Sequence, residues 1–284
     1  MGTVCNEVGM RDLKIAAVCM NSQVGEIERN LDRTEAFVSR ASDSGAHIIC
    51  FPELSITGYV LKDPAGVYAE ASPGQVLERV ARMAREKGLI IIAGLVEMAD
   101  REGPYISQVV AGPEGLLGFY RKTHLSPKEK GAYQAGGEID VFRYGETVFG
   151  IQLCYEAHFP EISTLMALKG AEIIFMPHAS PRGKPGEKLQ SWLRHLPGRA
   201  FDNAFYVVAC NQVGKTRQGF NFPGVVVALS PAGNVMAKYV GTHEELLLID
   251  FQRDEIEEIR KHRMAYFIPN RRPELYAELS SKSR

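Results

Sequence analysis

The sequence predicts an α/β fold, for two reasons. Short apolar runs rich in β-branched residues alternate along the chain with amphipathic stretches of helical period. Glycines stand where three of the helical patterns stop, at Gly45, Gly88 and Gly170, which suits the backbone just beyond a helix end. The pattern predicts one mixed sheet, or two stacked sheets, with helices packed on the outside.

The expected elements follow one another in a regular order. The runs 89–95 and 147–153 are apolar almost throughout, as expected for strands covered on both faces, and 106–122 has the pattern of a hairpin with a Pro/Gly turn. No linker or repeat interrupts the chain, so we expect a single domain. Strands are also expected at 13–20, 47–51, 171–176 and 205–210, and helices at 28–42, 75–88 and 159–170.

Composition and charge exclude several classes of function. The chain has 284 residues, 45% of them hydrophobic, which is enough for a large core. Lys plus Arg number 33 against 34 for Asp plus Glu, so the net charge of -1 gives no reason to expect a nucleic-acid partner. No signal-peptide pattern is present, and no run approaches the roughly 18 apolar residues of a membrane helix. We expect a cytoplasmic protein with no membrane partner.

The five cysteines predict neither disulfides nor a metal centre. They stand at positions 5, 19, 50, 154 and 210, an odd number without C-x-x-C pairs. Cys19, Cys50 and Cys210 fall within or at the end of apolar runs, where a free cysteine behaves as a small hydrophobic residue. Cys154 differs, because it ends the run 147–153 and is followed at once by polar residues.

Three predicted strand ends carry residues suited to catalysis. Glu53 follows an apolar strand, where desolvation would raise its pKa and make it a general base. Lys122 follows another, and a lysine there would stabilise an oxyanion. Cys154 precedes a helix that Pro160 begins, where helix amides and a nearby base favour a thiolate. Each residue alone is more simply a solvated or core side chain, but the three together supply base, cation and nucleophile.

Three segments then resemble the signature segments of the nitrilase superfamily, the carbon-nitrogen hydrolases with a Glu-Lys-Cys triad: FPELSITGY at 51–59, RKTHLSP at 121–127 and CYEAHFPE at 154–161. The resemblance extends over nearly the whole chain. It implies a four-layer α-β-β-α sandwich of two stacked mixed sheets, with a core at about 12–262. It also implies a homodimer, or a higher even-numbered oligomer, with the tail 263–284 at the interface.

The resemblance assigns roles to individual residues. It implies that Glu53 is the general base, Lys122 the oxyanion-stabilising cation and Cys154 the nucleophile, with the backbone N–H of Tyr155 as a second oxyanion donor. It places a further acid at Glu129, which would orient Lys122 or the substrate. No metal or organic cofactor is implied.

The same resemblance leaves the substrate open. Cleavage of a small linear amide or N-carbamoyl compound through a cysteine thioester is favoured, with nitrile hydrolysis and N-acyl transfer as alternatives in the enzyme class. A catalytically silent binding or scaffold protein is the alternative from another class. Many family amidases read Tyr-Asp-x-Arg after the cysteine, whereas this chain has Glu156 and His158. The arginine that carbamoyl-D-amino-acid hydrolases use is therefore missing.

We expect substrate identity to depend on residues near Glu156 and His158. His158 itself is better explained as a structural histidine. The loop that follows the strand at 171–176 would form one rim of the pocket. Its cations, Arg182, Lys184 and Lys188, are interpreted as solvated side chains.

Overall fold

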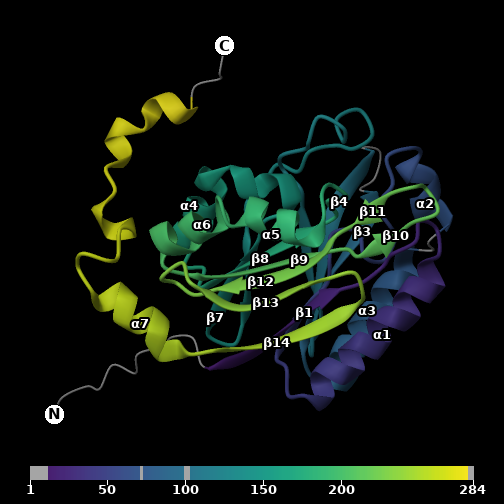
Figure 1. Cartoon of the computed structure of the whole chain (residues 1–284), viewed down its shortest axis with the longest axis horizontal. Helices are drawn as coiled ribbons and strands as arrows, with labels where there is room; N and C mark the ends of the chain where they lie inside the picture. The colour runs from purple at the N-terminus through teal and green to yellow at the C-terminus, as the bar shows by residue number, and fades with distance from the viewer. Residues whose placement is uncertain (1–11, 71–72, 99–102, 281–284) are drawn as a thin grey trace.

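Two six-stranded mixed sheets form the centre of the molecule (Figure 1). The computed structural model describes residues 12–70, 73–98 and 103–280. Cys5 lies outside the described residues. Helices cover the outer face of each sheet, so the expected four-layer α-β-β-α sandwich is confirmed, and the sequence alternative of one open sheet is excluded.

The first sheet has the order β14-β1-β2-β3-β4-β5. Strands β1, β2 and β3 are parallel, whereas β14, β4 and β5 each run antiparallel to the strand beside them. The β4–β5 pair is the hairpin expected from the sequence. The bounds are β1 Leu13–Cys19, β2 Ile48–Cys50, β3 Ile90–Met98, β4 Pro104–Gly112, β5 Gly115–Arg121 and β14 Glu245–Phe251.

The second sheet has the order β13-β12-β9-β8-β7-β6. Its central strands β7, β8 and β9 are parallel, with antiparallel strands at both edges. The bounds are β6 Val141–Tyr144, β7 Thr147–Ile151, β8 Ile173–His178, β9 Tyr206–Asn211, β12 Gly224–Leu229 and β13 Val235–Gly241. A small ribbon pairs β10 Gly214–Lys215 with β11 Asn221–Phe222.

Side chains that alternate along β1 build two separate cores. Ile15 and Ala17 belong to the cluster between the two sheets, and Ala16 and Val18 to the cluster between the first sheet and its helices. All four are fully buried, which explains why this strand is apolar throughout rather than at every second residue. The helices on this side are α1 Ile27–Asp43, α2 Pro64–Glu70 and α3 Pro73–Lys87.

Three short helices cover the second sheet: α4 Pro160–Leu168, α5 Pro185–Trp192 and α6 Leu196–Asn203. Gly45, Gly88 and Gly170 follow α1, α3 and α4 with positive φ, as the sequence predicted. After α7 Arg253–Lys261 the chain forms an arm beside α4 and α6 (Figure 1, yellow). The 3-10 turns of the arm are η2 Ile268–Asn270, η3 Pro273–Leu275 and η4 Ala277–Ser280. Among the described residues, no helix is long and apolar enough to span a bilayer.

Candidate active site

The carboxyl ends of four strands meet at one end of the sandwich. Strands β2 and β5 run in the same direction in the first sheet, and β7 and β8 in the second. Glu53, Lys122, Cys154 and Ala179 follow these four strands in that order. The charges of Glu53 and Lys122 act on the thiol of Cys154, which shows that the structure brings the three expected residues together.

A buried cation between two carboxylates forms the centre of the site. Lys122 Nζ lies 2.7 Å from Glu53 Oε1 and 2.9 Å from Glu129 Oε1, and the three side chains are at most 3% exposed. The second oxygen of each carboxylate accepts a backbone N–H, from Ala179 to Glu53 at 2.9 Å and from Ser126 to Glu129 at 2.7 Å. Every charged group therefore has a fixed partner, as burial of charge requires.

Burial and neighbouring charges set the pKa values in this cluster. Burial raises the pKa of Glu53, the Lys122 ammonium opposes this, and the Glu129 carboxylate reinforces it. Burial alone would lower the pKa of Lys122, but the charges of Glu53 and Glu129, joined by that of Cys154 when it is a thiolate, outweigh burial and hold that pKa well above its usual range. Lys122 is thus an ammonium at neutral pH, and Glu53 has the raised pKa that the sequence predicted.

The backbone at Glu53 is packed tightly against the neighbouring strand β3. Leu54 has a φ of +54°, and a Cβ at Gly94 would lie 2.2 Å from the Leu54 nitrogen. Only glycine therefore fits at position 94. Gln212 Nε2 donates to the Glu53 carbonyl at 2.9 Å. No sequence motif at Gly94 or Gln212 would have predicted that these residues position the backbone at Glu53.

Cys154 occupies a strained position at the start of the 3-10 helix η1 Cys154–His158. Its φ is +44°, in the left-handed region, where a residue with a side chain costs on the order of 1–2 kcal/mol. The helix expected after Cys154 begins at Pro160, as the sequence predicted, and η1 lies between Cys154 and that helix.

The pKa of the Cys154 thiol does not match the sequence expectation of a favoured thiolate. Burial and the Glu53 carboxylate raise it above its ordinary value, and Lys122 and the Ala179 amide only partly offset them. The expectation was wrong because burial and the negative charge of Glu53 both disfavour a thiolate at Cys154. Cys154 is therefore a thiol in the free protein, and a base would have to remove its proton before the sulfur could attack a substrate.

Glu156 joins the segment after β5 to the start of η1. Its carboxylate accepts the N–H and the hydroxyl of Thr123, both at 2.6 Å, the N–H of Leu153 at 2.6 Å, and the Tyr120 hydroxyl at 3.1 Å. Thr123 follows the site lysine, and Leu153 precedes the site cysteine. Glu156 is fully buried, and both its oxygens bond to the protein. Sequence reasoning placed Glu156 among the residues that support the site or orient the substrate, and these contacts favour the supporting role.

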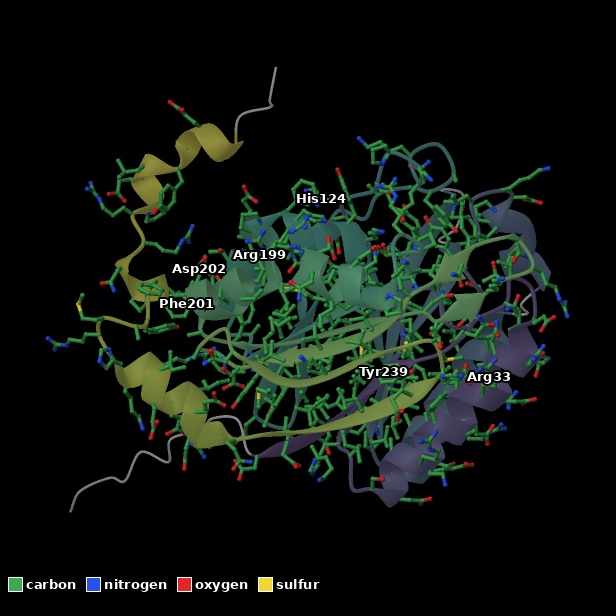
Figure 2. The ribbon with its side chains drawn as sticks, viewed as in Figure 1. Arg33, His124, Arg199, Phe201, Asp202 and Tyr239 are labelled. Atoms are coloured by element: carbon green, nitrogen blue, oxygen red, sulfur yellow. The ribbon has the colours of Figure 1, made fainter. Side chains whose placement is uncertain are left out.

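Tyr155 and His158 lie on the outer side of the same turn. The Tyr155 ring makes edge contacts with His158 and Phe159, at centroid distances of 6.0 and 5.5 Å. His158 is exposed, and its ring lies 4.5 Å from that of His195. Arg199 Nε donates to the Ala157 carbonyl at 3.1 Å, in keeping with a structural role (Figure 2).

Lys188 contradicts the interpretation of the rim cations as solvated. It is 8% exposed, whereas Arg182 and Lys184 are exposed as expected. Its Nζ lies 2.7 Å from Ser180 Oγ, and a Cys154 thiolate would act on its charge. The burial of Lys188 could have been predicted from the sequence. Lys188 precedes Trp192 by one helical turn, and both lie on the buried side of α5.

Tyr59, within the first signature segment, was also missed. It is 6% exposed, and its hydroxyl is close enough to interact electrostatically with Glu53, Lys122, Glu129 and Cys154. Burial is the main cause of its raised pKa, so it is a neutral phenol in the wall of the site.

No group of three His, Cys, Asp or Glu side chains within 12–70, 73–98 and 103–280 is arranged to hold a metal ion.

A surface hollow of about 540 Å³ lies between Tyr105, Arg121 and Asp140. None of Glu53, Lys122 and Cys154 lines it, so it is separate from this site.

Comparisons with known proteins identify the family. The carbon-nitrogen hydrolase family profile matches residues 14–261, and the chain belongs to that family. The chain is 32% identical over 274 residues to a nitrilase from Pyrococcus abyssi, covering 93% of this chain and 99% of the relative. It is 30% identical over 275 residues to an N-carbamoylputrescine amidase from Solanum lycopersicum, covering 89% and 90%.

Solved amidases share the fold. A crystal structure of an amidase from Nesterenkonia sp. has a TM-score of 0.81 at 26% identity, covering 94% of this chain and 96% of that one. A mutant of the amidase from Nesterenkonia sp. AN1 shows the result of Michael addition of acrylamide at the active site cysteine (TM-score 0.79, 26% identity, coverage 94% and 99%). The chain is a carbon-nitrogen hydrolase of the nitrilase superfamily, in its amidase branch.

Proposed function

We propose that the protein hydrolyses a small linear amide or N-carbamoyl compound through a thioester on Cys154. One observation carries this proposal: a lysine held between two buried carboxylates lies beside a strained cysteine at the converging strand ends. Glu53 is the base, Lys122 the cation and Cys154 the nucleophile. Glu129 positions Lys122, and Glu156 holds the segments that carry Lys122 and Cys154.

Acylation begins with a proton transfer. Glu53 accepts the thiol proton of Cys154, and the sulfur attacks the carbonyl carbon of the substrate. The carbonyl oxygen becomes an oxyanion, which Lys122 and the N–H of Tyr155 stabilise, and each such donor is worth on the order of 100-fold in rate. Glu53 then gives its proton to the nitrogen, the C–N bond breaks, and ammonia or an amine leaves.

Deacylation repeats the sequence with water. Glu53 removes a proton from a water molecule, which attacks the thioester carbon. The C–S bond breaks, the sulfur recovers a proton from Glu53, and the carboxylic acid leaves. The raised pKa of Glu53 suits both directions of proton transfer, because it lies nearer neutral pH than that of an exposed glutamate.

Intact-mass spectrometry tests the proposal directly. Wild type, Glu53→Gln and Cys154→Ser proteins are mixed with a panel of amides, N-carbamoyl compounds and nitriles. We expect an acyl adduct on Cys154 that turns over in wild type and is absent from Cys154→Ser. The absence of any adduct across the panel would favour a silent binding protein and remove the proposal.

The products separate the remaining alternatives. An N-carbamoyl substrate releases carbon dioxide with ammonia, whereas an amide or a nitrile releases ammonia and a carboxylic acid. Acyl transfer would give product only when an acceptor amine is present. Amides are favoured over nitriles here because the relatives with solved structures described above are amidases.

The apolar surface beside the C-terminal arm supports a homodimer. Leu165 and Leu168 on α4 are 43% and 52% exposed, and Phe201 on α6 is 45% exposed. Phe201 lies beside the arm, with its ring 5.5 Å from Phe267 (Figure 2). Such a surface is typical of an interface. Light scattering at micromolar concentration is expected to give the mass of two chains, and the mass of one chain would contradict the dimer.

A further inference from the structure

Lys188 is a buried cation whose protein environment does not neutralise it. It lies on the inner side of α5 beside Leu189, and its residue is 8% exposed. Its ammonium donates to the hydroxyl of Ser180 at 2.7 Å. Among the described residues, no carboxylate forms an ion pair with it.

The ammonium of Lys188 is tied to the catalytic centre through one peptide. Ser180 follows Ala179, whose N–H donates to Glu53 Oε2 at 2.9 Å. Ser180 itself is fixed by Asn211, which accepts its N–H at 2.9 Å and donates to its carbonyl at 3.1 Å. The position of Lys188 relative to the base is therefore set by rigid contacts.

The surroundings of Lys188 favour an incoming anion. Burial is the main cause that lowers its pKa, and the charge of Arg182 adds to this, whereas a thiolate at Cys154 would raise it. His178, packed 4.3 Å from the Trp192 ring, is fully buried and neutral, because burial holds its pKa well below its usual range. A buried cation with only a neutral partner is costly, and an anionic ligand removes that cost.

We propose that Lys188 binds a carboxylate of the substrate, so that the enzyme prefers amides whose acyl chain ends in an anionic group. Lys188 is then a specificity-determining residue, and this inference rests on the proposed amide hydrolysis. Lys122 does not compete with Lys188 for the carboxylate of the substrate, because Glu53 and Glu129 already neutralise the charge of Lys122.

Matched pairs of substrates isolate the contact. Malonamate, succinamate and glutaramate are compared with propanamide, butanamide and pentanamide, in which a methyl group replaces each carboxylate. Wild type is expected to favour at least one anionic amide over its neutral partner. Lys188→Met is expected to lower kcat/KM for that amide on the order of 30-fold or more, as when one partner of a buried ion pair is removed. Its neutral partner should change by less than about 3-fold.

Two controls accompany this experiment. Lys184→Met removes an exposed cation from the same loop and should leave both substrates unchanged. Lys188→Arg keeps the charge and should retain part of the preference for the anionic amide. Unfolding curves verify that each variant is folded.

Equal losses for the anionic and neutral amides would overturn the proposal, because they would show that Lys188 acts on Cys154 rather than on the substrate. The absence of any preference in wild type would overturn it as well. Calorimetric binding of the same anionic amides to Cys154→Ala, with and without Lys188→Met, decides the contact independently of turnover. If hydrolysis fails but binding still depends on Lys188, only the proposed function is lost.

Discussion

Lys122 and Lys188 are both buried near Cys154, but their environments differ. Lys122 lies between two carboxylates at 2.7 and 2.9 Å, and its pKa is raised. Lys188 contacts a hydroxyl at 2.7 Å, and its pKa is lowered. Burial acts in the same direction on both, so the partners account for the difference. The protein neutralises the cation proposed for catalysis and leaves the other for a ligand.

The comparison predicts opposite effects on stability. Lys122→Met would leave Glu53 and Glu129 buried without a cation, which typically costs about 3–5 kcal/mol. Lys188→Met removes a cation that has no buried anion, so the free energy of unfolding should change little or increase. Lys122→Met should also lower kcat by at least 100-fold. Urea unfolding at pH 7 and assays with butanamide measure both effects, and equal destabilisation by the two variants would contradict the comparison.

Glu129→Gln makes the environment of Lys122 more like that of Lys188. One of the two carboxylates becomes neutral while its size is kept, and we expect kcat to fall about 10- to 100-fold. The Glu129 charge raises the pKa of Glu53, so its loss should lower that pKa. The acid limb of the profile of kcat/KM against pH should therefore move to lower pH. A fall in kcat with an unchanged limb would mean that Glu129 has only a structural role. Glu138→Gln, on the surface of the same loop, is the control.

The smallest effect concerns stability against pH. The folded pKa of Lys188 lies below the ordinary value of 10.5, so the unfolded chain binds its proton more tightly. Wild-type stability should therefore rise with pH between the folded pKa and 10.5, and Lys188→Met should lack this rise. Any stability advantage of Lys188→Met should shrink as the pH increases. Urea unfolding between pH 7 and 10 measures this dependence. The free energy of unfolding of Lys184→Met should differ from that of wild type by a constant amount over the same range.

Much of the site was predictable because its residues stand at strand ends. Glu53, Lys122 and Cys154 each follow an apolar strand, and reactive groups gather at the carboxyl ends of strands, so the three could be proposed as one group. The structure shows that these strand ends come from two different sheets. The pKa of Glu53 was also predicted in the right direction, since it needs only burial. The pKa of Cys154 was not, because it depends on the neighbouring Glu53 carboxylate, which is 101 residues away in the chain.

The sequence by itself determined the alternation of strands and helices, the helix ends at Gly45, Gly88 and Gly170, and the residues suited to catalysis. These depend on local periodicity and on the chemistry of single side chains. Local periodicity left open whether two sheets stack, and the resemblance to the nitrilase superfamily supplied that expectation. Only the tertiary structure decided that Glu156 bonds to Thr123 and Leu153, and that Lys188 is buried without an anion. The physical reason is that burial and charge pairing depend on contacts between distant segments, and these contacts determine whether a lysine is solvated, neutralised or left for a ligand.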